Sequence, residues 1–170
     1  MRRCYGRGDL RFIAFRCYRR LPLLKSARAP DVFVRELSRV REEDKFQLLG
    51  YVVMPEHVHL LLSEPARGTP SGVLHKLKLR VSRRMRKRKK KASAGQLSLR
   101  FEESREPLRA FWQARFYDFN VYNERKKNEK LEYMHANPVE RKLVSHPKDW
   151  PWSSWAFYAR SGRVLLSMDV

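Results

Sequence analysis

The 170-residue sequence is poor in cysteine and contains no long apolar run. Cys4 and Cys17 are its only two cysteines, which excludes a disulfide framework and a four-cysteine zinc site. No stretch of about 18 apolar residues is present, and the charged N-terminus precedes no apolar segment, so neither a membrane span nor a secretory signal fits. We therefore expect a cytoplasmic protein.

Acidic residues are scarce relative to basic ones. The chain has 38 Lys and Arg against 18 Asp and Glu, which gives a net charge of +20 and a pI of about 10.6. Such a charge favours a polyanionic partner, because contacts with many phosphates release counterions. Nucleic acid is the leading candidate, and an anionic membrane surface is the competing one. The hydrophobic share of 42% is sufficient for a packed core, so the chain is not a disordered basic tail.

The hydrophobic pattern predicts one domain over residues 1–170 in which strands and helices alternate. The segments 46–54 and 57–63 form a tight antiparallel hairpin across Pro55, and Asp31 is the expected N-cap of a helix that ends near Asp44. Further elements are expected as a strand at 10–19, as one strand or a short hairpin at 111–122, and as helices from about 73 and from 124 to a stop at Pro138.

The region from about 73 to 106 is predicted to be a basic helix that leads into a mobile basic segment. Apolar residues recur every four positions between Val73 and Met85, which places a narrow stripe on the sheet. Eleven of the sixteen residues 76–91 are Lys or Arg, and they either contact phosphates or form a solvated helix face. The candidate phosphate contacts are Lys76, Lys78, Arg80, Arg83, Arg84, Arg86 and Lys87.

Aromatic residues gather in two places. The strand 111–122 mixes aromatic rings with a guanidinium, a composition that can stack unpaired bases and hold a single strand, although its aromatic residues could equally be core. Its candidate DNA-binding residues are Trp112, Gln113 and Arg115. The segment of about 139–170 is expected to be an aromatic C-terminal cover packed by Trp150, Trp152 and Trp155.

His57-Val58-His59 lies in a predicted strand. Residues at positions i and i+2 of a strand share one face, so the two imidazoles point the same way and could hold a metal ion as two prongs. A hydrogen-bonded pair of histidines without a metal is the competing interpretation.

Tyr133 and Asn137 lie four residues apart on a predicted helix and therefore share one helix face. The Asn137 amide oxygen could complete a metal site, or the two residues could serve only packing and the exit from the helix before Pro138. His135 is about 160° around the helix from Tyr133, since each residue turns roughly 100°, and we place it outside the site.

Several ordered blocks of the sequence resemble the single-tyrosine HUH transposases, in particular the REP-associated tyrosine transposases. The blocks cover most of the chain and read CYRRLPLL from Cys17, YVVMPEHVHLLL from Tyr51, WQARFYD from Trp112, EYMHANPV from Glu132 and WPWSS from Trp150. Their order along the chain is far more specific than a single His-X-His pair.

The resemblance implies an α+β fold, namely a ferredoxin-like HUH endonuclease domain with a central antiparallel sheet flanked by helices. It implies that Tyr133 is the nucleophile and that His57, His59 and Asn137 hold a divalent metal, Mg²⁺ or Mn²⁺. Imidazole softness alone would favour Zn, Ni, Cu or Fe, so open positions must add hard oxygen ligands.

The implied activity is cleavage and transfer of single-stranded DNA at or near hairpins through a covalent 5′-phosphotyrosine. The implied partner is single-stranded or hairpin DNA at the nucleoid, bound by a monomer or a homodimer. Two alternatives stay open: a non-catalytic protein of the same fold that binds DNA hairpins, and an RNA-binding protein, for which the charge and the aromatic strand would serve equally well.

Overall fold

The computed structural model describes residues 9–93 and 110–169, with side chains described as far as Arg86 in the helix that ends at Ser93. Four antiparallel strands form one sheet in the order β2-β3-β1-β4. The order of elements is βαββαβ followed by further helices, which is the ferredoxin-like arrangement, so the predicted α+β class is confirmed. The main elements are β1 (Leu10–Cys17), α1 (Arg28–Asp44), β2 (Leu48–Val53), β3 (His57–Leu62), α2 (Pro70–Ser93), β4 (Trp112–Val121) and α3 (Glu124–Glu140).

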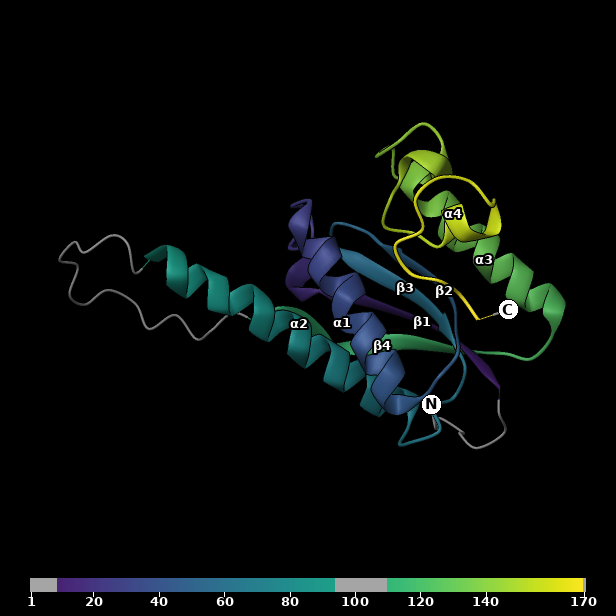
Figure 1. Cartoon of the computed structure of the whole chain (residues 1–170), viewed down its shortest axis with the longest axis horizontal. Helices are drawn as coiled ribbons and strands as arrows, with labels where there is room; N and C mark the ends of the chain where they lie inside the picture. Colours follow the sequence, from purple (N-terminus) through teal and green to yellow (C-terminus); the bar gives the residue numbers. More distant parts are fainter. Residues whose placement is uncertain (1–8, 94–109, 170) are drawn as a thin grey trace.

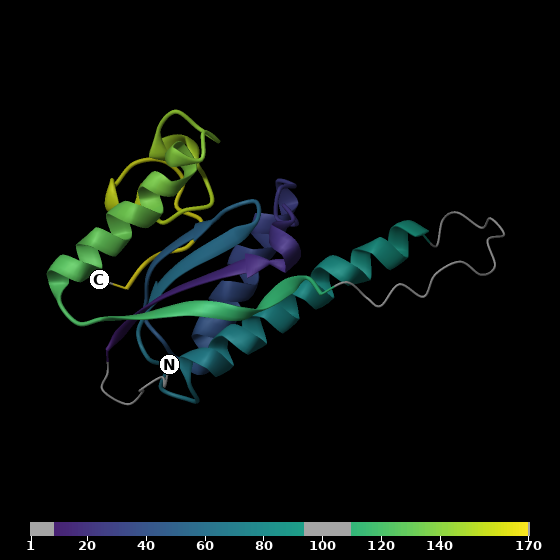
Figure 2. The same cartoon turned by 180° about the vertical axis from the view of Figure 1, so that it is seen from behind.

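Helices cover the two faces of the sheet unequally. Figures 1 and 2 show α1 and α2 together on one face and α3 on the other. The α1/α2 side encloses the larger core, which includes Ile13, Phe15 and Leu37, whereas α3 packs a smaller core through Leu131 and Met134. This division follows from strand alternation, because odd residues of β1 face α1 and α2 while even residues face the other side.

The element boundaries differ from the sequence-based expectations in two places. The first strand ends at Cys17 rather than at residue 19, because Tyr18–Arg20 turn away with positive φ angles at Arg19 and Arg20. The first helix begins at Arg28, so Asp31 is not its N-cap. Pro30 is tolerated there because the N–H groups of the first helical turn have no intrahelical partner.

The prediction that Pro138 ends its helix is also wrong. Helix α3 continues to Glu140, and the next backbone N–H, of Arg141, still donates to the Asn137 carbonyl at 3.0 Å. Pro138 lies in the last turn, so its missing N–H removes only one hydrogen bond of the helix.

The basic helix is also longer than expected, because α2 remains helical to Ser93 and projects beyond the sheet (Figure 1). The expected mobile segment up to about residue 106 lies outside the described residues.

The C-terminal segment covers the β2 edge of the sheet with backbone hydrogen bonds. Ser153 forms a bridge with Val52, and the Ser154 and Asp169 N–H groups donate to the Tyr51 and Leu48 carbonyls, both at 2.9 Å. Its other elements are a 3-10 turn at Pro147–Asp149 and α4 (Trp155–Tyr158).

The tryptophans of this cover pack as expected. The Trp150 indole donates to the Val53 carbonyl at 3.0 Å, and that of Trp152 to Asp31 at 2.8 Å. Trp155 lies against the His146 ring at 5.5 Å.

Gly50 allows α3 to lie close to β2. A Cβ atom at this position would lie 2.7 Å from Leu131 Cδ2 and 2.9 Å from Met134 Cε, both closer than ordinary van der Waals contact. The helix that carries Tyr133 and Asn137 therefore rests almost directly on the strand. In the part of the chain that the structure describes, no helix has the length and apolar character needed to span a membrane.

Candidate functional site

His57 and His59 lie on β3, a central strand, and both side chains face α3. Their ring centroids are 4.8 Å apart at an interplanar angle of 85°. Neighbouring strands flank them on both sides, since His59 is opposite Ala14 of β1 and Val52 of β2. The two histidines are consequently buried, with 7% and 5% of their surface exposed.

The surroundings of the two imidazoles keep them neutral. Burial lowers the pKa of His57, partly offset by Glu56, and burial followed by the neighbouring His57 lowers the pKa of His59 to about 3. His57 Nδ1 lies 3.0 Å from a Glu56 oxygen, and because a carboxylate only accepts, this nitrogen carries the proton. Nε2 of His57 then has a free lone pair, the arrangement usual for a metal-binding histidine whose other nitrogen is held by a carboxylate.

Asn137 adds an amide to the pair of histidines. The residue is buried, and its Nδ2 lies 3.5 Å from His59 Nε2. Asn137 Oδ1 and His59 Nδ1 are buried without a hydrogen-bond partner among the described residues. A buried unpaired acceptor is costly, so the Asn137 oxygen is suited to bind an ion or a water molecule.

The donor set fits a divalent ion with open coordination positions. Within residues 9–93 and 110–169, no cluster of three His, Cys, Asp or Glu side chains forms a metal site, and the third potential donor beside the two histidines is the neutral amide of Asn137. Two imidazoles and an amide oxygen leave positions for water or phosphate oxygens, as catalytic sites require. Those oxygens would provide the hard ligands that Mg²⁺ or Mn²⁺ prefers.

Tyr133 lies one helical turn before Asn137 and borders the histidines. Its ring is 5.5 Å from that of His59 and 6.1 Å from that of Phe12, in edge-to-face geometry in both cases. The side chain is 45% exposed, so a substrate can approach it from solvent. The fold thus brings together four residues that are separated by up to 80 positions in the sequence: Tyr133, Asn137, His57 and His59.

His135 lies outside this group, as expected. Its Nε2 is 2.8 Å from Ser154 Oγ and its ring is 5.8 Å from that of Tyr158, both in the C-terminal segment. Burial lowers the pKa of His135 to about 4.

We expect His135 to make the fold less stable in acid. Because its folded pKa lies below its unfolded value of about 6.5, the unfolded state binds more protons, and stability is lost as pH falls from about 6.5 to about 4. His135→Gln should flatten the dependence of unfolding free energy on pH in this window by at most about 1.4 kcal/mol per pH unit. Chemical denaturation at several pH values, with chelator present, measures this slope. The exposed His75→Gln variant is the control, and equal slopes for both variants would contradict the expectation.

The predicted phosphate contacts of α2 lie across the sheet from the histidines, and α1 already pairs three of them. Arg80 donates both guanidinium NH₂ groups to Glu43 at 2.6 and 2.7 Å. Arg84 lies 3.1 Å from Glu36, and Lys76 pairs with Asp44. The α1 carboxylates thus hold α2 to α1, which the pattern of α2 alone could not indicate.

The other basic candidates of α2 differ among themselves. Lys78 is half-buried, with its Nζ 5.2 Å above the Phe15 ring and 2.9 Å from the Gln113 carbonyl, and burial lowers its pKa to about 8. Arg83 and Arg86 are exposed, and Arg83 forms no ion pair with a described residue. The Lys87 side chain lies outside the described part.

The candidate DNA-binding residues of the aromatic strand β4 also differ in exposure. Trp112 is buried, its ring lies 5.1 Å from that of Phe15, and its indole donates to the Lys78 carbonyl, so it belongs to the core and is not available for stacking. Gln113 and Arg115 are exposed. Tyr117, another ring of the aromatic strand whose composition suggests base stacking, is 53% exposed on the same sheet face as His59.

Arg16 and Arg141 are further cations near the site that sequence reasoning missed. Arg16 is opposite His57 in the register of β1 and β3, and both arginines are exposed. Their charges contribute to lowering the pKa of both histidines. The register could have identified Arg16 once the pairing of the strands was known.

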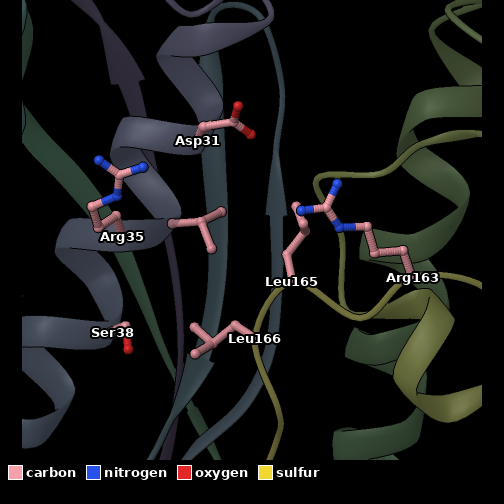
Figure 3. Close-up of a pocket in the computed structure, with 7 residues that line it drawn as sticks. Asp31, Arg35, Ser38, Arg163, Leu165 and Leu166 are labelled. Atoms are coloured by element: carbon pink, nitrogen blue, oxygen red, sulfur yellow. The ribbon is translucent and has the colours of Figure 1, made fainter.

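A separate cavity of about 390 Å³ lies between α1 and the C-terminal segment (Figure 3). Arg35 and Arg163 extend from its opposite walls, and Leu165 and Leu166 contribute apolar surface. None of its seven lining residues is a histidine, cysteine or tyrosine, so the reactive side chains are concentrated at His57, His59 and Tyr133 instead.

The fold and the grouped side chains define a ferredoxin-like domain with a paired-histidine and tyrosine site. Residues 9–137 match the model of the family described as "Transposase IS200 like", and the chain belongs to this family. The match ends at Asn137 and so includes both histidines and Tyr133.

Named relatives and solved structures agree with this family. The chain is 25% identical over 131 residues to the REP-associated tyrosine transposase of Escherichia coli K12, covering 77% of this chain and 66% of that protein. It is 26% identical over 117 residues to a Haemophilus influenzae protein whose name assigns it to the same group, covering 67% and 61%. The chain therefore spans somewhat less than two thirds of the length of these relatives.

The solved structures bear on the fold. One, a REP-associated tyrosine transposase bound to a REP hairpin, has a TM-score of 0.70 and 22% identity, covering 99% of this chain and 91% of that one. Another, a Deinococcus radiodurans protein described as a transposase, has a TM-score of 0.51 and 18% identity, covering 78% and 93%.

Proposed function

We propose that the chain is a metal-dependent single-stranded DNA endonuclease and strand transferase that cuts at or near hairpins. The observation that carries this proposal is the grouping of an exposed tyrosine with two neutral imidazoles and a buried amide oxygen without a partner. A decayed site in a mere binding protein would be expected to have lost part of this set. The relative solved with a REP hairpin supports the class of DNA.

The chemistry follows from the side chains. A divalent ion, Mg²⁺ or Mn²⁺, held by His57, His59 and Asn137 would polarise the scissile phosphate and stabilise its developing charge. The Tyr133 hydroxyl oxygen attacks phosphorus and loses its proton, the bond from phosphorus to the 3′ oxygen breaks, and that oxygen leaves as a 3′-OH. The 5′ phosphate remains on Tyr133 as a phosphodiester.

Tyrosine suits a reversible transfer. A phenol has a free pKa of about 10, so phenolate leaves more readily than an alkoxide does. The 3′-OH of another strand can therefore attack the phosphotyrosine, which restores the Tyr133 hydroxyl and joins the two strands.

The test is a denaturing gel of the protein incubated with labelled single-stranded DNA hairpins and Mn²⁺ or Mg²⁺. We expect a covalent protein–DNA band that chelator abolishes and that RNA hairpins and duplex DNA do not produce. A hairpin that binds tightly without forming the band would favour the non-catalytic binding protein, and tighter binding of RNA would favour an RNA-binding protein.

Salt dependence distinguishes the paired from the unpaired cations of α2. Arg83→Gln should flatten the slope of log affinity against log salt by up to about 0.9, since an exposed guanidinium without an ion pair in the described structure is available to a phosphate. Arg80→Gln has the same change in net charge, but Glu43 already holds that guanidinium, so its effect should be smaller. Fluorescence anisotropy with a labelled hairpin measures both slopes. Equal slopes for the two variants would show that the ion pair is irrelevant to DNA contact.

A further inference from the structure

The sheet face that carries the histidines is covered only in part. Helix α3 packs over β2 and β3 through Leu131 and Met134, and its Lys130 and Tyr133 reach the Phe12 ring on β1. Tyr117 of β4 stays exposed on the same face. Tyr133 at the rim of α3 and Tyr117 on β4 are 45% and 53% exposed. The uncovered part of the face therefore begins at the candidate nucleophile.

A row of three residues leads from the buried His59 to the exposed Tyr117. Ala14 of β1 is opposite His59 on one side and Tyr117 on the other. Residues opposite one another in neighbouring strands share a sheet face. Ala14 has the smallest side chain after glycine, so this row itself has no large side chain between His59 and Tyr117, and the nearest ring is that of Phe12.

Neighbouring rings hold Tyr117 in place. Its ring is nearly parallel to that of Phe119, at 8° and 6.4 Å, and lies edge-on to Phe12 at 6.4 Å. Phe12 in turn stacks on His59 at 5.4 Å and contacts Tyr133 at 6.1 Å. Tyr117 and Tyr133 both border one ring, so they are no more than a few nucleotides apart along a strand whose stacked bases rise about 3.4 Å each along the helix axis.

Cations border the same strip. Lys130 Nζ lies 4.8 Å from the centre of the Phe119 ring and 5.2 Å from that of Phe12. Arg16 is exposed opposite His57 at the other end. Aromatic faces flanked by cations are the composition with which proteins hold unpaired nucleotides without reading their sequence.

We propose that Tyr117 is a base-stacking platform for an unpaired nucleotide next to the scissile phosphate, on the open part of the sheet beside Tyr133. The inference rests on the proposed function for the location of the scissile phosphate. It corrects the assignment of stacking to Trp112, whose ring is buried on the opposite face of the sheet.

The experiment detects stacking without chemistry. Tyr133→Phe protein in chelator is titrated with DNA hairpins whose unpaired flanks carry a single 2-aminopurine, moved one position at a time. We expect quenching of its fluorescence at one or two adjacent positions of one flank. Adding Tyr117→Ala should remove that quenching and lower affinity about 5- to 100-fold, while Tyr117→Phe should keep both.

Tyr122→Ala is the matched control, because Tyr122 directly follows β4 and is 65% exposed. It should change neither quantity. Unchanged quenching in the Tyr117→Ala protein, equal loss in the control, or no quenched position in any flank would overturn the inference. Circular dichroism confirms that each variant is folded.

Failure of the proposed function would give a different experimental result from failure of the stacking inference. If native protein with Mn²⁺ forms no covalent band on the quenched hairpin, the transfer activity is refuted, while the Tyr117-dependent quenching still stands as a binding subsite. If the band forms and quenching does not depend on Tyr117, only the stacking inference fails.

Discussion

Tyr133→Phe should abolish the covalent protein–DNA band, with a loss of at least about a thousand-fold in the rate of cleavage, and should leave hairpin affinity within about twofold. The substitution removes only the attacking oxygen, while the ring contacts with His59 and Phe12 stay in place. A denaturing gel measures the band, and fluorescence anisotropy in chelator measures the affinity.

Tyr122→Phe is the control for this variant, since it removes a hydroxyl from an exposed tyrosine away from the histidines. The Tyr122 variant should cleave at the wild-type rate. A band of wild-type intensity from the Tyr133 variant would assign the attack to another residue and would remove the central element of the proposed mechanism.

His59→Ala should eliminate metal-dependent cleavage and weaken Mn²⁺ binding beyond detection at micromolar protein. His59 faces Asn137 at 3.5 Å and His57 at 4.8 Å between ring centroids, so its loss leaves two donors of the three. Isothermal titration with Mn²⁺ reads metal binding directly, and hairpin binding in chelator should be largely retained.

Glu56→Gln should have a smaller effect on Mn²⁺ binding than His59→Ala. Glu56 accepts from His57 Nδ1 at 3.0 Å and orients the ring, so its replacement should weaken Mn²⁺ binding about 10- to 100-fold without abolishing it. His135→Gln, which alters a buried histidine that contacts Ser154, should bind Mn²⁺ as wild type does. Wild-type Mn²⁺ affinity in the His59 variant would refute the metal assignment.

The elements of the fold could be predicted from sequence because their residues repeat at the periods of strands and helices. The three predicted strands after the first agree with β2, β3 and β4 to within two residues. The boundaries that differ depend on local chemistry: Pro30 can lie in the first turn of a helix because the N–H groups there have no intrahelical partner, and Pro138 can lie in a last turn at the loss of one hydrogen bond.

The spacing of residues in the sequence predicts two separate pairs of site residues, and not the complete site. Strand spacing places His57 beside His59, and helix spacing places Tyr133 beside Asn137, but local periods cannot bring the two pairs together. That step came from the family resemblance, and in the structure it results from α3 crossing β2 and β3. Whether these residues have the implied roles remains a prediction.

The surface predictions could not include partners distant in sequence. A period of four marks Lys76, Arg80 and Arg84 as one helix edge, but it cannot show that Asp44, Glu43 and Glu36 lie opposite them. Alternation likewise cannot show which face of β4 is covered, so the sequence cannot distinguish the buried Trp112 from the exposed Tyr117.

The contact at Gly50 gives β2 control over the geometry of a site in which it has no functional side chain. Tyr133 and Asn137 belong to one helix, so a change in the distance between that helix and β2 would move both residues together. His57 and His59 belong to the neighbouring strand β3 and would not move with the helix. A residue that touches neither metal nor DNA thus supports the packing of both helix residues, and a larger side chain at this position would first have to displace the ends of the Leu131 and Met134 side chains.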